Sequence, residues 1–286
     1  MSAPRVLILG GHGKVSLFLQ PLLLAKKWHV TSVVRNPAYE AEILALGKDK
    51  PGKIDVLVDS LDDVKEVSDA KRVLEKVKPD IVVWSAGAGG KGGPARTKAI
   101  DMVAAKCYIS ASLAMPSVKK FLMVSYHAVS YLEFPISLPI PGNSRRGYPP
   151  WWTDEDRKAA DNTNQNILPA YYQAKVEADE HLEALAKKRF DSGDQEFQAI
   201  NLRPGTLTDK PGTGKVTLGK THVGGGVPRE DVARVAAALL DRNDTRGWFD
   251  LLEGDVPIEE AIDSLVKSGH NGLEGEDMQR IWARET

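Results

Sequence analysis

Residues 5–16, RVLILGGHGKVS, combine a short apolar run with three glycines. The apolar run predicts a strand that is covered on both faces, and the residues after the glycines favour a helix. Glycines let the backbone turn sharply and approach a diphosphate, and the start of a helix offers free N–H groups and a positive dipole end. The stretch therefore predicts a dinucleotide-binding turn, with a plain tight turn as the alternative. The expected cofactor contacts here are Gly10, Gly11, His12, Gly13, Lys14 and Val15.

Further β-branched or aliphatic runs follow, and helical patterns separate most of them. The expected strands are 5–9, 30–34, 54–58, 81–84, 121–125, 198–202 and 248–252, and the expected helices are 13–27, 62–77, 94–115, 168–190, 229–241 and 257–268. Such alternation is typical of a parallel sheet with crossover helices. We therefore expect an α/β fold: a doubly wound, mainly parallel Rossmann sheet with helices on both faces and a small substrate-side or lid region. In these folds ligands bind beyond the carboxyl ends of the strands.

The composition limits the classes of partner. The chain has 286 residues, a formal net charge of -1 and a single cysteine, Cys107. A dedicated nucleic-acid-binding protein carries a basic excess, and no apolar run approaches the ~20 residues of a membrane span. A lone cysteine excludes an internal disulfide framework and is expected as a small buried residue. We expect a cytoplasmic protein that binds a small-molecule substrate, without nucleic acid, membrane or metal, and we leave a homodimer open.

The ends of the next three strands carry further candidate contacts. Arg35 ends the second strand, where NAD-preferring sites usually place an acidic residue that binds the ribose. A guanidinium can form a forked pair with a 2′-phosphate, so we expect NADP(H) as the preferred cofactor and NAD(H) as an alternative; a plain surface arginine is the other interpretation. Asp59, Ser60 and Leu61 are expected beside the adenine, although Asp59 also fits a helix N-cap. The small residues expected to let the chain pass close to the cofactor are Ser85, Ala86 and Gly87.

Two adjacent tyrosines, Tyr171 and Tyr172, precede Lys175. Residues four apart share a face of a helix, so Tyr171 lies beside Lys175 whereas Tyr172 lies beside Val176. A phenol titrates near 10, and a cation within ~4–6 Å favours its ionised form. Tyr171 is therefore the tyrosine expected to give or take a proton.

Taken in order, the motifs resemble the short-chain dehydrogenase/reductase superfamily, in particular its atypical NAD(P)H-binding branch and a largely uncharacterised fungal-type group within it. They are the glycine turn 10–16, VVRNP at 33–37, VVWSAGAGGKG at 82–92, FLMVS at 121–125, YYQAK at 171–175, NLRPGTL at 201–207 and PREDVA at 228–233.

The resemblance implies a role for each of three residues at the reaction centre. Tyr171 would be the general acid or base, Lys175 would lower the pKa of Tyr171 and bind the nicotinamide ribose, and Ser125 would orient the substrate carbonyl. The turn expected to meet the nicotinamide carboxamide is formed by Pro204, Gly205 and Thr206. The chain also departs from the family pattern, because no secure equivalent is evident for the asparagine that completes the usual proton relay.

The domain prediction is a single Rossmann-like domain over 1–286, with an insertion or lid at 126–166 and a small substrate-side region at 206–286. Segments as long as this insertion are commonly lids or binding loops. Its aromatic and basic residues could cover the nicotinamide and bind an anionic substrate, or the aromatic residues could simply pin the segment to the domain; they are Arg145, Arg146, Tyr148, Trp151 and Trp152. Thr153 and the acids after it predict a short helix within the insertion.

These observations predict an NADP(H)-dependent oxidoreductase that acts on a small carbonyl or alcohol. A nucleotide-sugar epimerase or dehydratase would use the same serine, tyrosine and lysine. A redox sensor or scaffold of the NmrA-like type would use the cofactor site without turnover. Tyr171 and Lys175 favour an enzyme over the sensor.

Overall fold

The computed structural model describes residues 3–127 and 148–284. A nine-stranded sheet crosses the molecule in the order β11-β8-β10-β6-β5-β4-β1-β2-β3. Seven of its strands pair in parallel, and they are β1 (Arg5–Leu9), β2 (His29–Val34), β3 (Lys53–Val58), β4 (Ile81–Trp84), β5 (Lys120–Val124), β6 (Gln198–Pro204) and β10 (Gly247–Glu253). The other two strands, β8 (Lys215–Gly219) and β11 (Val256–Pro257), pair antiparallel, and β11 forms the edge of the sheet.

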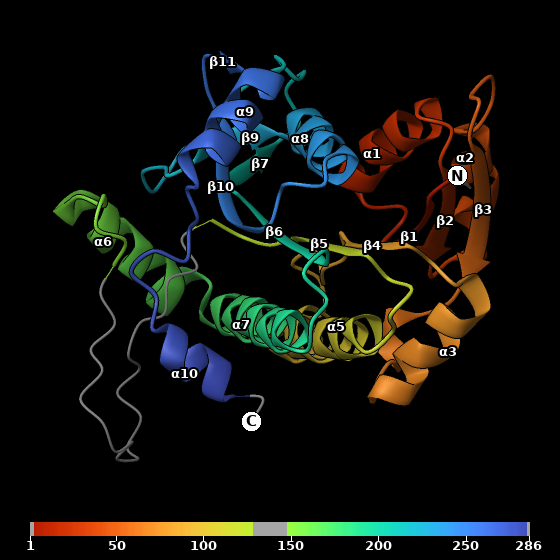
Figure 1. Cartoon of the computed structure of the whole chain (residues 1–286), viewed down its shortest axis with the longest axis horizontal. Coiled ribbons are helices and arrows are strands. Elements are labelled where there is room, and N and C mark those ends of the chain that lie inside the picture. Colours follow the sequence, from red (N-terminus) through yellow and green to blue (C-terminus); the bar gives the residue numbers. More distant parts are fainter. Residues whose placement is uncertain (1–2, 128–147, 285–286) are drawn as a thin grey trace.

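Helices cover both faces of the sheet (Figure 1). One face carries α1 (Lys14–Ala25), α8 (Arg229–Asp241) and α9 (Ile258–Ser268), and the other carries α3 (Val67–Val77), α5 (Ala105–Leu113) and α7 (Pro169–Asp191). Each layer has its own hydrophobic core against the sheet, because side chains along buried parallel strands alternate between two covered faces. The expected doubly wound α/β fold is confirmed.

The strands expected at 5–9 and 81–84 have those bounds, and the others agree within a few residues. The helix expected at 94–115 is divided into α4 (Gly93–Thr97), a π-helical segment (Lys98–Ala104) and α5. The short helix expected after Thr153 is α6 (Asp154–Asp161), and the Thr153 side chain accepts a hydrogen bond from the Asp156 backbone N–H, as an N-cap does. A second π-helical segment (Asn162–Ile167) joins α6 to α7.

Several short elements were not expected from the sequence. They are α2 (Glu40–Ala45), β7 (Thr206–Thr208), β9 (Gly226–Pro228), α10 (Met278–Ala283) and the antiparallel strands β8 and β11. β7 and β9 form a separate two-stranded parallel sheet. Region 206–286 therefore contributes β8, β10 and β11 to the main sheet, as well as this small sheet.

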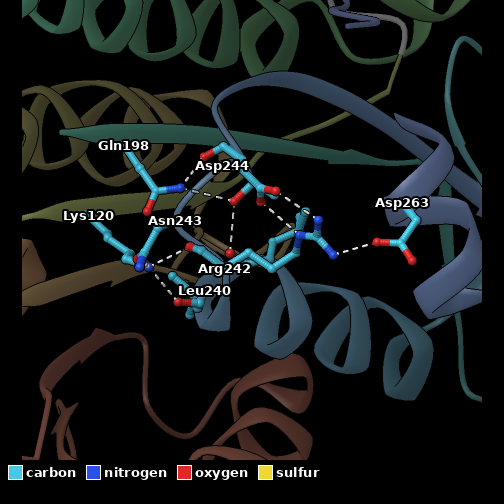
Figure 2. Close-up of polar contacts among 9 residues, drawn as sticks. Lys120, Gln198, Leu240, Arg242, Asn243, Asp244 and Asp263 are labelled. Atoms are coloured by element: carbon cyan, nitrogen blue, oxygen red, sulfur yellow. Dashed lines mark hydrogen bonds and ion pairs between the residues drawn. The ribbon is translucent and has the colours of Figure 1, made fainter. Parts of the chain in front are cut away.

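The amino end of β5 is joined to the end of α8 by a group of polar side chains (Figure 2). Lys120 Nζ donates to the carbonyl oxygens of Leu240 at 2.9 Å and Arg242 at 2.6 Å, so it satisfies acceptors at the helix C-terminus. Arg242 in turn pairs with Asp244 at 2.8 Å and with Asp263 of α9 at 2.6 Å. This group fixes the α8–β10 connection at the edge opposite the carboxyl ends of the parallel strands.

Candidate active site

The glycine turn lies between β1 and α1, as expected. Gly10 has φ +85°, and a Cβ added there would lie 2.7 Å from Ala86 Cα, so the turn packs directly against the chain after β4. A side chain at Gly11 would overlap Ser32. Gln20 of α1 donates to the Gly11 carbonyl oxygen at 2.9 Å and holds the turn against the helix. This close approach of two backbone segments beside a helix start fits a dinucleotide.

A cavity of about 200 Å³ continues from the turn along the ends of β2 and β3. Its lining includes predicted contacts from four segments: Gly10, Gly11, His12, Gly13, Arg35, Asp59, Leu61, Ser85, Ala86 and Gly87. Ser60 is not part of this lining; its hydroxyl accepts a hydrogen bond from the Asp62 backbone N–H and caps a short turn. Asp59 pairs with Arg72 at 2.7 Å while it faces the cavity.

Two arginines meet one carboxylate in this cavity. Arg35 Nη1 lies 2.7 Å from Asp62 Oδ2, and Arg96 Nε lies 2.9 Å from Asp62 Oδ1. Hydrogen bonds from Arg96 and Arg35 outweigh burial and lower the pKa of Asp62. Arg96 and Asp62 were missed by the sequence analysis because neither stands at a strand end. His12 also lines the cavity, with its ring stacked 3.5 Å from that of Tyr39.

A second cavity, of about 520 Å³, brings the proposed reaction residues together. Tyr171 and Lys175 reach it from α7, and Ser125 reaches it from the end of β5. It shares Gly13 and the segment Ser85–Gly87 with the first cavity, so the two form one elongated site. The other lining residues named in the sequence analysis are Lys14 and Val15.

The protonation state of Tyr171 differs from the expectation. Burial raises the pKa of its phenol, and the nearby carboxylates of Asp101 and Asp179 raise it further. Lys175 Nζ lies 5.9 Å from the centre of the Tyr171 ring and donates to the Val124 carbonyl oxygen at 3.1 Å. The expected lowering of the Tyr171 pKa by Lys175 is therefore wrong for this structure, because burial and two negative charges outweigh one cation.

Two buried carboxylates were missed by the sequence analysis. Asp179 lies one turn after Lys175 on α7 and accepts the Ser125 hydroxyl at 2.7 Å. Asp101 lies in the π-helical segment after α4, lines the reaction cavity and accepts the Ala88 backbone N–H at 3.0 Å. Burial raises the pKa of both carboxyls. The i+4 spacing from Lys175 could have revealed Asp179, whereas no motif or spacing in the sequence marks Asp101.

A sequence profile described as NAD(P)H-binding matches residues 10–243. The chain belongs to the NAD(P)H-binding family. UPF0659 protein C216.03 of Schizosaccharomyces pombe is 32% identical over 92% of this chain and 96% of its own, in agreement with the fungal-type resemblance. The uncharacterized sugar epimerase YhfK of Bacillus subtilis is 29% identical over 91% of this chain and 100% of its own.

A solved structure from Bacillus halodurans, assigned as an NAD-dependent epimerase/dehydratase, superposes with a TM-score of 0.66 at 25% identity, over 92% of this chain and 100% of its own. These relatives place the chain in the oxidoreductase and epimerase-like superfamily of NAD(P)H-binding proteins.

Backbone hydrogen bonds hold the predicted carboxamide turn of this NAD(P)H-binding protein. Pro204 still belongs to β6, and neither Pro204, Gly205 nor Thr206 is among the residues that line the two cavities. The Gly205 backbone N–H donates to the Leu251 carbonyl oxygen at 2.9 Å, and the Thr206 N–H donates to the Gly225 carbonyl oxygen at 3.1 Å. Leu207 lines the reaction cavity instead. A carboxamide contact by the three residues remains a prediction.

Trp151 and Trp152 of the insertion pack onto the loop after β8. The indole N–H groups of Trp151 and Trp152 both donate to the Thr221 carbonyl oxygen, at 3.1 and 3.2 Å. The Tyr148 hydroxyl donates to Asp161 at 2.7 Å. None of these three aromatic side chains lines the reaction cavity, which favours the packing interpretation for this part of the insertion. Arg145 and Arg146 lie outside the described residues.

Three further observations concern the described residues as a whole. Cys107 is buried on α5, and burial raises the pKa of its thiol. Within 3–127 and 148–284, no group of three or more His, Cys, Asp or Glu side chains could hold a metal ion. The helices of the same ranges include none with the length and apolar character required to cross a membrane.

Proposed function

We propose that this protein is an NADP(H)-dependent oxidoreductase that acts on a small carbonyl or alcohol. The observation that carries the proposal is the meeting of Tyr171, Lys175 and Ser125 in one cavity that continues into the glycine turn. When bound, NADP(H) would supply or accept the hydride. The protein's own residues then have to place the substrate and handle one proton.

Tyr171 is the proposed proton donor in the direction of carbonyl reduction. Its phenol stays protonated because burial and the charges of Asp101 and Asp179 disfavour the phenolate. A protonated phenol can donate to a carbonyl oxygen as negative charge develops on that oxygen. The protonated phenol is the form of Tyr171 that carbonyl reduction requires.

Lys175 is the proposed ribose ligand. An ammonium group has three donors, and the contact with the Val124 carbonyl oxygen uses one of them. The side chain is only 1% exposed, so its position is fixed by packing. This leaves donors for the ribose hydroxyls and holds the positive charge beside Tyr171.

Ser125 is the proposed second contact to the substrate oxygen. Its hydroxyl proton points to Asp179 in this structure, so the hydroxyl would have to turn from Asp179 towards the substrate to donate. Asp179 thereby controls which way the Ser125 proton points. Turning towards the substrate would break the buried hydrogen bond to Asp179, and this cost reduces the net stabilisation that Ser125 can give the substrate oxygen. Tyr171 is therefore the main proposed donor.

The proposed preference for NADP(H) rests on Arg35 and Arg96. Both guanidinium groups line the adenosine-side cavity, and together they carry one positive charge more than Asp62 neutralises. A 2′-phosphate would meet two forked donors there. Asp62 is also a carboxylate of this cavity that could accept a ribose hydroxyl of NAD(H).

The sugar epimerase reading is the second candidate, because two relatives carry epimerase or dehydratase names. The two candidates differ in whether the cofactor is consumed. We would screen carbonyl compounds and nucleotide sugars with NADPH and NADH, and follow both absorbance at 340 nm and product stereochemistry. Net NADPH oxidation supports the oxidoreductase, and isomerisation without net oxidation supports the epimerase. NADPH binding without any turnover would favour the sensor over both.

A further inference from the structure

Two cations stand at the starts of neighbouring helices beside the glycine turn. Lys14 is the first residue of α1, and Arg229 is the first residue of α8. Both line the reaction cavity together with Gly13. The two helices lie next to each other on one face of the sheet (Figure 1).

These positions are electrostatically unfavourable for cations. The N-terminus of a helix carries a partial positive charge, which repels lysine and arginine in the first turn. Glu230 and Asp231 have the favourable sign in α8, but they bind the backbone N–H groups of Gly212 and Thr213. Residues that break a local stability rule beside a cavity point to a ligand, in this case an anion.

A single carboxylate pairs with both cations in this structure. Asp209, which follows β7, lies 2.7 Å from Lys14 Nζ through one oxygen and 2.7 Å from Arg229 Nη1 through the other. The Asp209 side chain is 64% exposed, whereas that of Arg229 is 22% exposed. Hydrogen bonding to Lys14 and the charge of Arg229 hold the pKa of Asp209 below its usual value.

We propose that Lys14 and Arg229 form a cation pair for the diphosphate of the cofactor, and that Asp209 is a built-in competitor whose place the diphosphate takes. This inference deepens the proposed function and rests on its cofactor site. A diphosphate at the glycine turn carries two negative charges beside two helix starts, and the Asp209 carboxylate carries one. The diphosphate is therefore the stronger partner for the pair, and binding has to break two exposed ion pairs.

The same arrangement occurs at the other end of the elongated site. Asp62 bridges Arg35 and Arg96 where the 2′-phosphate is expected. The two carboxylates should differ in one respect. NADPH and NADH share the diphosphate, so Asp209 should affect both equally, whereas Asp62 should affect mainly NADPH.

The test is calorimetric titration of NADPH and NADH into the full chain and four variants, with melting temperatures measured without cofactor. Arg229→Gln should lower the affinity for both cofactors by about tenfold, since a charge-assisted contact is lost. Asp209→Asn should raise the affinity for both cofactors by about two- to fivefold, because binding then no longer has to break exposed ion pairs. In the Arg229→Gln background, Asp209→Asn should tighten binding less than it does in the wild type, because only Lys14 is then released. Arg242→Gln, at the opposite edge of the sheet (Figure 2), is the matched control and should bind normally.

Asp209→Asn also separates a competitor from a structural ion pair. If Asp209 is a competitor, the variant should have a lower melting temperature and a higher cofactor affinity. If Asp209 is only structural, both the melting temperature and the cofactor affinity should fall. Unchanged or weaker binding by Asp209→Asn would overturn the proposal. So would unchanged cofactor affinity in Arg229→Gln with a raised KM for anionic substrates alone, because the anion would then belong to the substrate. Wild-type protein that bound neither cofactor would overturn the proposed function and this inference together.

Discussion

The two ends of the parallel strands use polar side chains in different ways. At the amino end, Lys120 and Arg242 are each held by several partners within the protein, and they close the end of α8 (Figure 2). At the carboxyl end, Arg35 and Arg229 line a cavity, and each pairs with a carboxylate, Asp62 for Arg35 and Asp209 for Arg229. The first arrangement should contribute to stability and the second to binding and chemistry. Mutations at the two ends should therefore separate these properties.

The largest effect is expected for Tyr171→Phe at the carboxyl end. The change removes the phenolic proton but keeps the ring, so turnover should fall by roughly 10²–10⁴ with NADPH affinity nearly unchanged. Steady-state rates with a substrate from the screen test this. Tyr172→Phe is the matched control: Tyr172 is buried, and it should keep most of the turnover and change stability instead. Full activity in Tyr171→Phe would disprove the tyrosine mechanism.

Arg35→Ala should come next, with an effect on one cofactor alone. The loss of a forked contact should lower the affinity for NADPH by about tenfold, while the affinity for NADH should stay within about threefold of the wild-type value. Fluorescence titration of both cofactors measures the difference. Arg72→Ala is the control, because Arg72 pairs with Asp59 but is not among the residues that line the cavity. Equal affinities for NADPH and NADH in the wild type would remove the basis for the NADP(H) preference.

Lys120→Met tests the amino end. The carbonyl oxygens of Leu240 and Arg242 would lose a charged donor, so the free energy of unfolding should fall by about 1–3 kcal/mol. Turnover of the folded enzyme should not change. Urea unfolding and activity measurements on Lys120→Met and on the exposed neighbour variant Lys119→Met supply the comparison. A loss of turnover at unchanged stability would contradict the assignment of this end to stability.

The smallest effect is expected from Asp156, which joins α6 to the loop after β8. Its carboxylate accepts hydrogen bonds from His222 Nδ1 and the Val223 N–H, both at 2.7 Å. Burial raises its pKa, but hydrogen bonds from His222, Thr153 and Val223 outweigh burial and bring the pKa to about 2. A folded pKa below the unfolded value of about 4 contributes stability that is present above pH ~4 and lost as the pH falls towards 2.

Asp156→Asn should remove this pH dependence. The variant should be less stable than the wild type at pH 6, and the difference should shrink as the pH falls from about 4 to about 2. Urea unfolding at several pH values measures it. A difference that stayed constant with pH would assign the role of Asp156 to packing rather than charge.

The parallel sheet and its glycine turn could be predicted because buried strands leave continuous apolar runs in the sequence. The antiparallel strands β8 and β11 could not be predicted, because β8 has only five residues with no continuous apolar run and β11 has two. The division of 94–115 into α-helical and π-helical parts was also hidden, since periodicity does not distinguish the two over seven residues.

In the candidate site, too, features that depend on nearby residues could be predicted, and features that depend on residues far apart in the chain could not. The i+4 spacing predicted that Tyr171 and Lys175 would share a face, and both line the cavity. Arg96, Arg229 and Asp209 come from segments far apart in the chain, so only the fold brings them to the cofactor site. Glu230 and Asp231 are sufficient to explain the start of α8, so the sequence gives no separate signal for Arg229.

The edges of the nine-stranded sheet bear on aggregation. An edge strand presents backbone groups that can pair with another chain, and short strands, proline and charged side chains oppose this. β11 is two residues long and ends in Pro257, which has no N–H to donate. β3, at the other edge, carries Lys53 and Asp55, which pair with each other at 3.0 Å. Each edge thus carries a feature that discourages strand addition, so the long sheet can remain a scaffold for the site without recruiting other chains.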